Sequence, residues 1–171
     1  IFSNWIILVI VFSASIQKIS TGVAGFIFIL YSIINGITLS AIFLVFEITS
    51  IGLVFFISAG MFLSMSFYGK FTKSNLNSAG RYLMMALFGV LIATLVNFLL
   101  KSSILEWIIS LVTLVLFIGL TAYDTQKIVK ASELADGSDT FKKAAVFGAL
   151  ELYLDFLNIF LSLLNLFGKK R

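Results

Sequence analysis

Three carboxylates lie in stretches of this chain that are otherwise apolar enough to be buried in lipid. Asp124 lies in the stretch 121–127, Asp155 lies in the stretch 152–156, and Glu151 precedes Asp155 by about one helical turn. An ionised carboxylate at the centre of a bilayer costs about 2.5–3.5 kcal/mol even on the milder scales, so such residues usually line an ion or proton route. These three acids are therefore the candidate functional residues.

The depth of each acid follows from its distance to the nearest lysine that could mark a membrane interface. Counted from Lys130, Asp124 lies roughly 9 Å inside; counted from Lys143, Glu151 lies roughly 12 Å and Asp155 roughly 18 Å inside, at 1.5 Å per residue. Glu151 and Asp155 share one helix face because they are four residues apart. Straight, untilted helices would bring Asp124 closer to Glu151 than to Asp155, so pairing the two aspartates would need a tilt or an unwound turn.

Two buried carboxyls that approach each other cannot comfortably both ionise, and they would share a proton. Such a pair is a proton-controlled site, and its oxygen atoms also suit a hard cation such as calcium. The alternative is that each acid only accepts hydrogen bonds or pairs with a nearby lysine. Lys127 and Lys130 are close enough in sequence to Asp124 for that. Two other acids, Glu47 and Glu106, are expected at the membrane interfaces.

The composition is that of an integral membrane protein. The chain has 171 residues, of which 60% are hydrophobic and 12% charged, and its mean hydropathy is +1.12. Ordinary soluble domains carry about 25% charged residues. The net charge of +4 is interpreted as a signal of membrane topology and not of nucleic-acid binding.

The sequence argues against an enzyme and against a bound cofactor. It has no cysteine and no histidine, which excludes disulfides and thiol chemistry and argues against the usual zinc and haem sites. It has no nucleophile elbow, no phosphate-binding glycine loop and no zinc-protease histidine pair. Tyr123-Asp124 matches one motif of the presenilin-like aspartyl proteases, but their second motif, Gly-Leu-Gly-Asp, is missing.

The predicted fold is an all-α integral membrane bundle that forms one domain over residues 1–171. About 20 apolar residues span the hydrocarbon core, and helices satisfy their own backbone groups there. The candidate spans are 1–17, 23–46, 48–67, 82–100, 104–123 and 144–167. A tight turn is expected at 47–50, and loops are expected at 70–81 and 127–143, the second of them with helical extensions. Small residues that suit close helix packing are Gly22, Ala24, Gly25, Gly36 and Ser40.

The basic residues favour one orientation in the membrane. With six spans, one side collects eight of them: Lys18, Lys70, Lys73, Arg81, Lys127, Lys130, Lys142 and Lys143. The other side collects four: Lys101, Lys169, Lys170 and Arg171. The positive-inside rule makes the first side cytoplasmic. The membrane is expected to be a bacterial inner membrane, with the mitochondrial inner membrane as the alternative.

Several of these segments resemble the Bax inhibitor-1 family of transmembrane proteins, particularly its bacterial members. TAYDTQKI at 121–128 and GALELYLDFLNIF at 148–160 resemble the last two helices of that family. NGITLS at 35–40 resembles its third helix, and the segment 58–73 resembles its fourth. The resemblance covers nearly the whole chain and implies a seven-helix fold, so that a first helix would be missing ahead of Ile1.

The resemblance also implies a function and assigns residues to it. The family pattern implies a pH-sensitive calcium leak that is gated by two aspartates, here Asp124 and Asp155, with calcium as the transported ion. A basic residue at the cytoplasmic end of the second helix would latch that pair, and Lys18 stands at or near this position. Lysine lacks the planar guanidinium fork with which an arginine could bind both carboxylates at once, which argues against a bidentate latch. Glu151 replaces the small or polar residue expected there and would be an accessory acid.

Two other functions remain open on the same residues. The chain could be a non-transporting interaction protein that modulates a membrane protease or cell-death and stress machinery, in which case its acids are structural. It could also exchange calcium for protons. The expected partners are the lipid bilayer, calcium and protons, with other membrane proteins in the second case and no nucleic acid in any.

Overall fold

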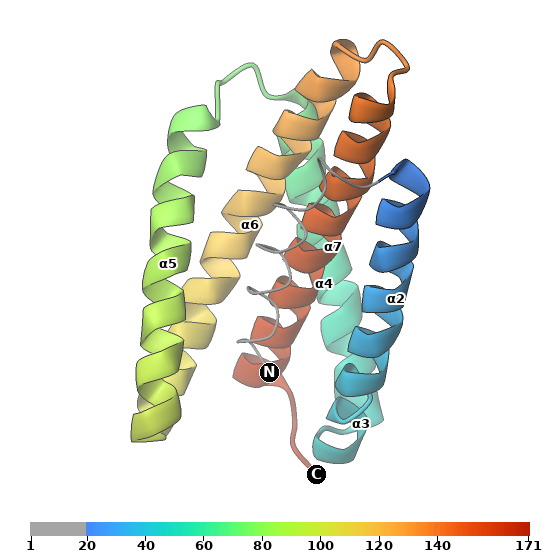
Figure 1. Ribbon diagram of the computed structural model, residues 1–171. Helices are drawn as coiled ribbons and strands as arrows, with labels where there is room; N and C mark the ends of the chain where they lie inside the picture. Colours follow the sequence, from blue (N-terminus) through green and yellow to red (C-terminus); the bar gives the residue numbers. More distant parts are fainter. Residues whose placement is uncertain (1–19) are drawn as a thin grey trace.

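The computed structural model describes residues 20–171, and the named elements of this part are all helices (Figure 1). They are α2 (Thr21–Leu39), α3 (Ile42–Val45), α4 (Ile48–Phe71), α5 (Asn77–Leu100), α6 (Ser103–Glu133) and α7 (Asp139–Phe167). The prediction of an all-helical membrane protein is confirmed. The first expected span, 1–17, lies outside the described residues.

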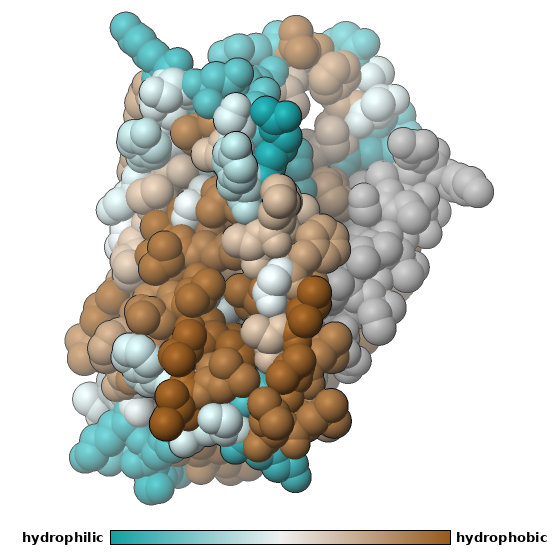
Figure 2. Space-filling model, turned by 90° about the vertical axis from the view of Figure 1, so that its left-hand side faces the viewer, coloured by the Kyte–Doolittle hydropathy of each residue, from teal (hydrophilic) through white to brown (hydrophobic). Residues whose placement is uncertain are grey.

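Five segments of the described part are long and apolar enough to cross a membrane. They are Gly22–Val45, Ile48–Phe71, Asn77–Leu100, Ser103–Glu133 and Asp139–Phe167. Their outward-facing side chains are largely apolar, and Figure 2 shows a hydrophobic band between two hydrophilic ends of the molecule. Four helices, α4 to α7, begin or end in the expected loops. Hydropathy marks only the lipid-buried part of a helix, whereas backbone hydrogen bonding continues into the polar turns.

The expected span 23–46 is not one uninterrupted helix. It is interrupted at Ser40, whose side-chain hydroxyl donates to the carbonyl of Ile37 at 2.6 Å, and the short α3 follows. The turn expected at 47–50 is also wrong, because α4 already begins at Ile48 and the extended residues Phe46 and Glu47 make the connection. Ser32 and Ser58 bond nearby carbonyls in the same way inside continuous helices, so the bond made by Ser40 marks the break and does not by itself cause it.

The carboxyl-terminal tail fixes the connection between α3 and α4. The backbone N–H of Glu47 donates to the carbonyl of Lys169, and the N–H of Arg171 donates to that of Val45, both at 2.9 Å. The ammonium of Lys169 also pairs with the carboxylate of Glu47 at 2.9 Å. The end of α7 is thereby held against the start of α4.

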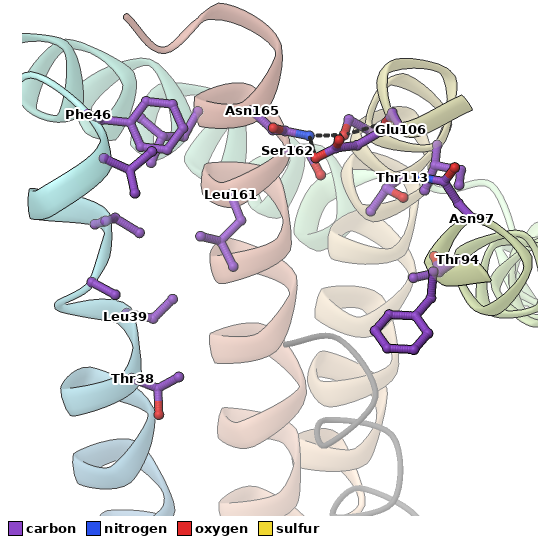
Figure 3. Close-up of a pocket in the computed structure, with 17 residues that line it drawn as sticks. Thr38, Leu39, Phe46, Thr94, Asn97, Glu106, Thr113, Leu161, Ser162 and Asn165 are labelled. Carbon is purple, nitrogen blue, oxygen red and sulfur yellow. Dashed lines mark hydrogen bonds between the residues drawn. The ribbon is translucent and has the colours of Figure 1, made fainter. Parts of the chain in front are cut away.

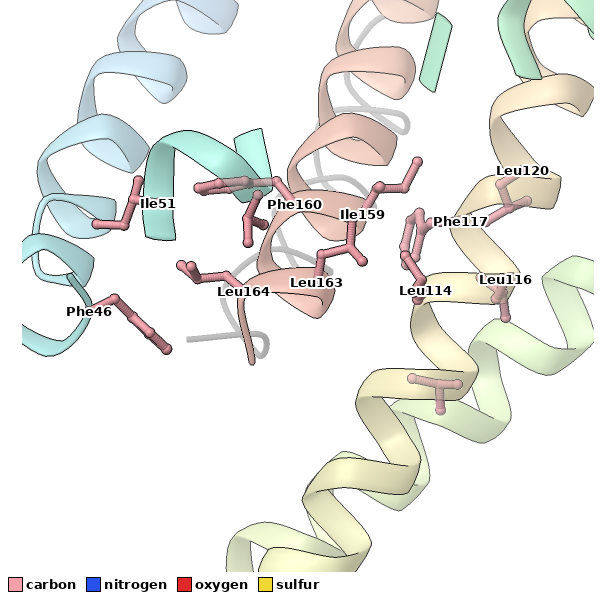
Figure 4. Packing of buried hydrophobic residues seen from close by; sticks show 12 residues of the cluster. Phe46, Ile51, Leu114, Leu116, Phe117, Leu120, Ile159, Phe160, Leu163 and Leu164 are labelled. Carbon is pink, nitrogen blue, oxygen red and sulfur yellow. The ribbon is translucent and has the colours of Figure 1, made fainter. Parts of the chain in front are cut away.

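Helices α6 and α7 form the centre of the bundle. Helix α7 packs against α6, α4 and α2, and α6 packs also against α4 and α5. Figure 4 shows the main apolar cluster between these elements. Its buried members on α6 are Leu114, Leu116, Phe117 and Leu120, and those on α7 are Ile159, Phe160, Leu163 and Leu164. The segments that carry the candidate acids are therefore the best-packed segments of the described chain.

Close helix packing depends on glycines other than those expected. A Cβ at Gly69 of α4 would collide with the backbone carbonyl of Ala122, and one at Gly148 would meet the side chain of Ile128 at 2.7 Å. These contacts bring α4 and α7 against α6 on either side of Asp124. No described atom lies within 4 Å of a Cβ built at glycines 22, 25 or 36. Ala24, by contrast, is fully buried as expected.

Candidate functional site

The three acids singled out in the sequence come together between α6 and α7. Asp124 is on α6, and Glu151 and Asp155 are on α7. The two aspartates are buried, with exposed fractions of 8% for Asp124 and 3% for Asp155. We call this cluster, together with Lys127, the carboxylate site.

The carboxyl groups of Asp124 and Asp155 lie within side-chain hydrogen-bonding reach of each other. Both helices remain continuous through these residues, so no unwound turn is needed to bring them together. The Oδ2 atom of Asp155 is buried and has no hydrogen-bond partner among the described residues. Most buried polar atoms have a partner, so this oxygen is an exception that calls for an explanation.

Lys127 is the cation of the carboxylate site, and it binds mainly to Glu151. Its Nζ atom donates to both oxygens of Glu151, at 2.6 and 2.8 Å, and lies 4.0 Å from Oδ1 of Asp124. Glu151 is thus neutralised by a lysine one helix away. The sequence left open a direct ion pair between Asp124 and a lysine. The structure contains that pair only as this 4.0 Å contact with Lys127.

Lys130 does not reach the acids. It donates to the side-chain oxygen of Gln126 at 2.9 Å and lies 3.4 Å from that of Asn75. Lys18, the expected latch, lies outside the described residues. Within residues 20–171 the charged groups that act on the two aspartates are therefore Glu151 and Lys127.

Gln126 is a structural residue of the site that sequence reasoning missed. Its carboxamide accepts from the backbone N–H of Leu76 at 3.0 Å and donates to the carbonyl of Ser74 at 2.8 Å. It thereby fastens the α4–α5 loop to α6 two residues beyond Asp124. The available signal was a glutamine just beyond the expected apolar span 104–123, but its partners are about fifty residues away in sequence.

The carboxylate site, as the described residues form it, is not a preformed calcium cage. Calcium takes 6–8 oxygen ligands, whereas the described residues contain no group of three or more acids or histidines arranged as metal ligands. A cation at Asp124 and Asp155 would keep several of its water molecules. This donor set fits a transient ion better than a permanently bound one.

The fold and the carboxylate site define an α-helical integral membrane protein with buried acidic residues between its last two helices. Sequence comparison identifies its family. The family model described as "Inhibitor of apoptosis-promoting Bax1" matches residues 1–171. The chain therefore belongs to the Bax inhibitor-1 family.

The relatives that match this chain include several bacterial membrane proteins. "Inner membrane protein YbhL" of Escherichia coli K12 is 51% identical over 166 residues, which are 96% of this chain and 71% of that protein. An uncharacterized protein of Borreliella burgdorferi is 46% identical over 165 residues, again 96% of this chain and 71% of the relative. No solved structure matches the chain. Together with the five helices of residues 20–171 that are long and apolar enough to cross a membrane, these similarities make the chain an integral protein of a bacterial inner membrane.

Proposed function

We propose that this protein is a pH-sensitive calcium leak of the Bax inhibitor-1 type, gated by Asp124 and Asp155. The observation that carries the proposal is the burial of two facing carboxyls on neighbouring helices, one of them with an oxygen that lacks a partner. A buried polar pair of this kind is costly unless it is fully satisfied. Its protonation is therefore coupled to how α6 and α7 pack.

The charges of the carboxylate site suggest the direction of this coupling. Lys127 is the one cation near the acids in residues 20–171, and it already forms an ion pair with Glu151. A proton shared between Asp124 and Asp155 leaves a single negative charge between the helices. Loss of that proton leaves two charges in a medium of low dielectric constant, where repulsion is strong. Deprotonation therefore drives α7 away from α6 and opens the leak.

The test is calcium flux into proteoliposomes that contain the purified protein, measured from acidic to neutral pH. Asp124→Asn and Asp155→Asn should each flatten the rise of flux with pH, because each removes one titrating member of the pair. Asp136→Asn is the matched control. Hydrogen bonds from Ser138 lower the pKa of Asp136, so this loop carboxylate stays ionised over the whole range, and its loss should leave the pH dependence unchanged.

Two results would overturn the proposal. If both aspartate variants keep the wild-type pH dependence, the two carboxyls do not gate the leak. If the purified protein shows no flux at any pH, the protein acts as a non-transporting partner of other membrane proteins, because an interaction protein is silent on its own. A flux that requires an opposing proton gradient would change the mechanism from a passive leak to calcium–proton exchange.

A further inference from the structure

The connection between α4 and α5 carries a group of cations without acids beside them in the sequence. Lys70 lies in the last turn of α4, Lys73 lies in the loop, and Arg81 lies near the start of α5. The sequence has no aspartate or glutamate between Glu47 and Glu106. Within residues 20–171 none of the three cations forms an ion pair. We call Lys70, Lys73 and Arg81 the basic hairpin cluster.

Contacts with α6 bring the two ends of the cluster to the same level. A Cβ at Gly69 of α4 would collide with the backbone of Ala122, and one at Gly80 of α5 would collide with the ring of Tyr123. Because Ala122 and Tyr123 are consecutive residues, α4 and α5 touch α6 at the same height. The first and last cations of the cluster directly follow these two glycines in the sequence. They therefore flank one short stretch of α6.

The loop of the cluster is held in place by α6. The side chain of Gln126 accepts from the N–H of Leu76 at 3.0 Å and donates to the carbonyl of Ser74 at 2.8 Å. Lys130 donates to Gln126 at 2.9 Å and lies 3.4 Å from the side-chain oxygen of Asn75, so it adds a further positive charge beside the loop. A loop that is already ordered loses little conformational entropy when it binds a partner.

Acids of α7 at this end of the bundle already have lysine partners. Glu151 pairs with Lys127 at 2.6 Å, and Asp139 pairs with Lys143 at 3.1 Å. Neither pair includes a cation of the hairpin. The positive charge of the basic hairpin cluster is therefore not balanced by these acids.

The opposite end of the bundle offers no such surface. Lys169 pairs there with Glu47 at 2.9 Å. A cavity of about 400 Å³ at that end has no lysine or arginine among its described lining residues. Figure 3 shows Asn165 reaching across this cavity toward a second acid, Glu106, and its amide nitrogen lies 3.4 Å from the carboxylate. Uncompensated positive charge is thus a feature of the α4–α5 end.

Aromatic residues beside the cluster mark the level of a membrane interface. Tyr68 and Phe71 of α4 and Tyr82 of α5 are exposed, and tyrosines gather where the hydrocarbon core meets the lipid headgroups. The ammonium of Lys70 lies 5.3 Å from the centre of the Phe71 ring. Figure 2, which views the molecule from the side of α5, shows a hydrophilic end above the hydrophobic band. The cluster therefore lies at the height of lipid headgroups.

We propose that the basic hairpin cluster binds the headgroup of an anionic phospholipid. Arg81 offers a planar fork that can donate two parallel hydrogen bonds to a phosphate, whereas Lys70 and Lys73 act as point charges. Exposed apolar residues one turn deeper, Phe67 on α4 and Met85 on α5, lie alongside the acyl chains. The headgroup meets no acid of the hairpin, and its binding does not depend on the proposed calcium leak.

The test measures which lipid lies beside the cluster in a bilayer. Tyr82→Trp, combined with Trp5→Phe and Trp107→Phe, places a single tryptophan next to Arg81 at an exposed position. The protein is reconstituted in phosphatidylcholine with a rising fraction of phosphatidylglycerol, and one of the two lipids is brominated because bromine quenches nearby tryptophan. Each cation near an anionic lipid strengthens the attraction about fivefold. Phosphatidylglycerol should therefore be preferred about tenfold or more.

Neutralising the cluster should remove this preference. In the triple variant Lys70→Gln, Lys73→Gln and Arg81→Gln, phosphatidylglycerol should be preferred less than about twofold, because the local charge is lost. Quenching by brominated phosphatidylcholine should stay as in the parent protein, which shows that the variant is folded and inserted. The charge-retaining variant Lys70→Arg, Lys73→Arg and Arg81→Lys should keep most of the preference.

A matched control removes the same number of charges from the opposite end of the bundle. It combines Lys101→Asn, Lys170→Gln and Arg171→Gln, which lie outside the hairpin loop. The asparagine suits the left-handed backbone of residue 101, whose φ is 51°. The lipid preference at the reporter tryptophan should be unchanged in this variant, because the overall charge of the protein does not select the lipid.

Four results would overturn the inference. Equal quenching by the two brominated lipids in the parent protein means that no anionic lipid is selected. A preference that survives neutralisation of the cluster places the lipid elsewhere, and an equal loss in the matched control attributes it to overall charge. Loss of the preference on adding inorganic phosphate, but not sodium chloride of the same ionic strength, would make the cluster a site for a soluble phosphate instead.

Discussion

The ion pair between Lys127 and Glu151 provides the most direct test of the carboxylate site. The lysine bonds both oxygens of Glu151, at 2.6 and 2.8 Å, and joins α6 to α7. At about 4 Å and an effective dielectric constant of about 20, two unit charges attract by about 4 kcal/mol. The Lys127 side chain is 44% exposed and that of Glu151 18%, and pairs exposed to solvent contribute only about 0–1 kcal/mol. We expect a coupling free energy of about 1–2 kcal/mol, between these two limits.

The two single substitutions should differ in cost. Lys127→Met leaves the carboxylate of Glu151 without a partner and also removes the cation 4.0 Å from Asp124. Glu151→Gln leaves a lysine that can turn toward solvent, because nearly half of its side chain is already exposed. The first should therefore destabilise the protein more than the second. In the double variant, residue 151 is neutral and much of the cost of losing Lys127 should disappear.

The measurement is a double-mutant cycle on the free energy of unfolding, taken from far-UV circular dichroism during reversible unfolding in mixed micelles. Lys130→Met is the matched control, since Lys130 lies one turn further along α6 and bonds Gln126 instead of an acid. Its cycle with Glu151→Gln should be additive. If the Lys127–Glu151 cycle is also additive to within about 0.5 kcal/mol, the two charges contribute no net coupling and do not hold α6 against α7.

Two further predictions concern how the carboxylate site is held in place. Gly69→Ala should destabilise the protein by about 1–3 kcal/mol in the same unfolding assay, since the added methyl group meets the backbone carbonyl of Ala122. Gly52→Ala lies on the same helix, and no described atom comes within 4 Å of its added Cβ. It should be neutral or stabilising, and equal losses for the two variants would contradict the packing role of Gly69. Gln126→Ala should speed amide hydrogen exchange at Leu76, whose N–H then loses its acceptor; unchanged exchange would show that the loop does not depend on Gln126.

Membrane helices could be predicted from the sequence because hydropathy and length carry a direct signal. Each expected span within the described part corresponds to a helix or to α2 with α3. The interruption after Leu39 has no such signal, because the apolar residues continue through it as far as Phe46. Hydropathy also underestimates the lengths of α6 and α7, since polar residues in the terminal turns can stay helical without being apolar.

The candidate site could be predicted only in part from the sequence. Asp124 and Asp155 are conspicuous because charge is rare in apolar segments. The partner of Glu151 is a different matter, because Lys127 is 24 residues away and the pairing depends on how α6 is rotated against α7. Helical spacing correctly places Glu151 on the face of Asp155, but it does not show whether Lys127 or Lys130 pairs with Glu151. The packing of α6 against α7 determines that it is Lys127.

Rigid helices connect the proposed proton-sensitive pair to the apolar layer beside it. Phe117 precedes Asp124 by seven residues on α6, and Ile159 follows Asp155 by four on α7, so each lies on the same helix face as its aspartate. Phe117 and Ile159 are buried in one apolar cluster next to the carboxylate site on α6 and α7. A movement of α7 that separates the two carboxyls must therefore also separate this apolar layer. In the proposed leak, one displacement of α7 would therefore both relieve the carboxylate repulsion and let water into the apolar layer, so that no second switch is required.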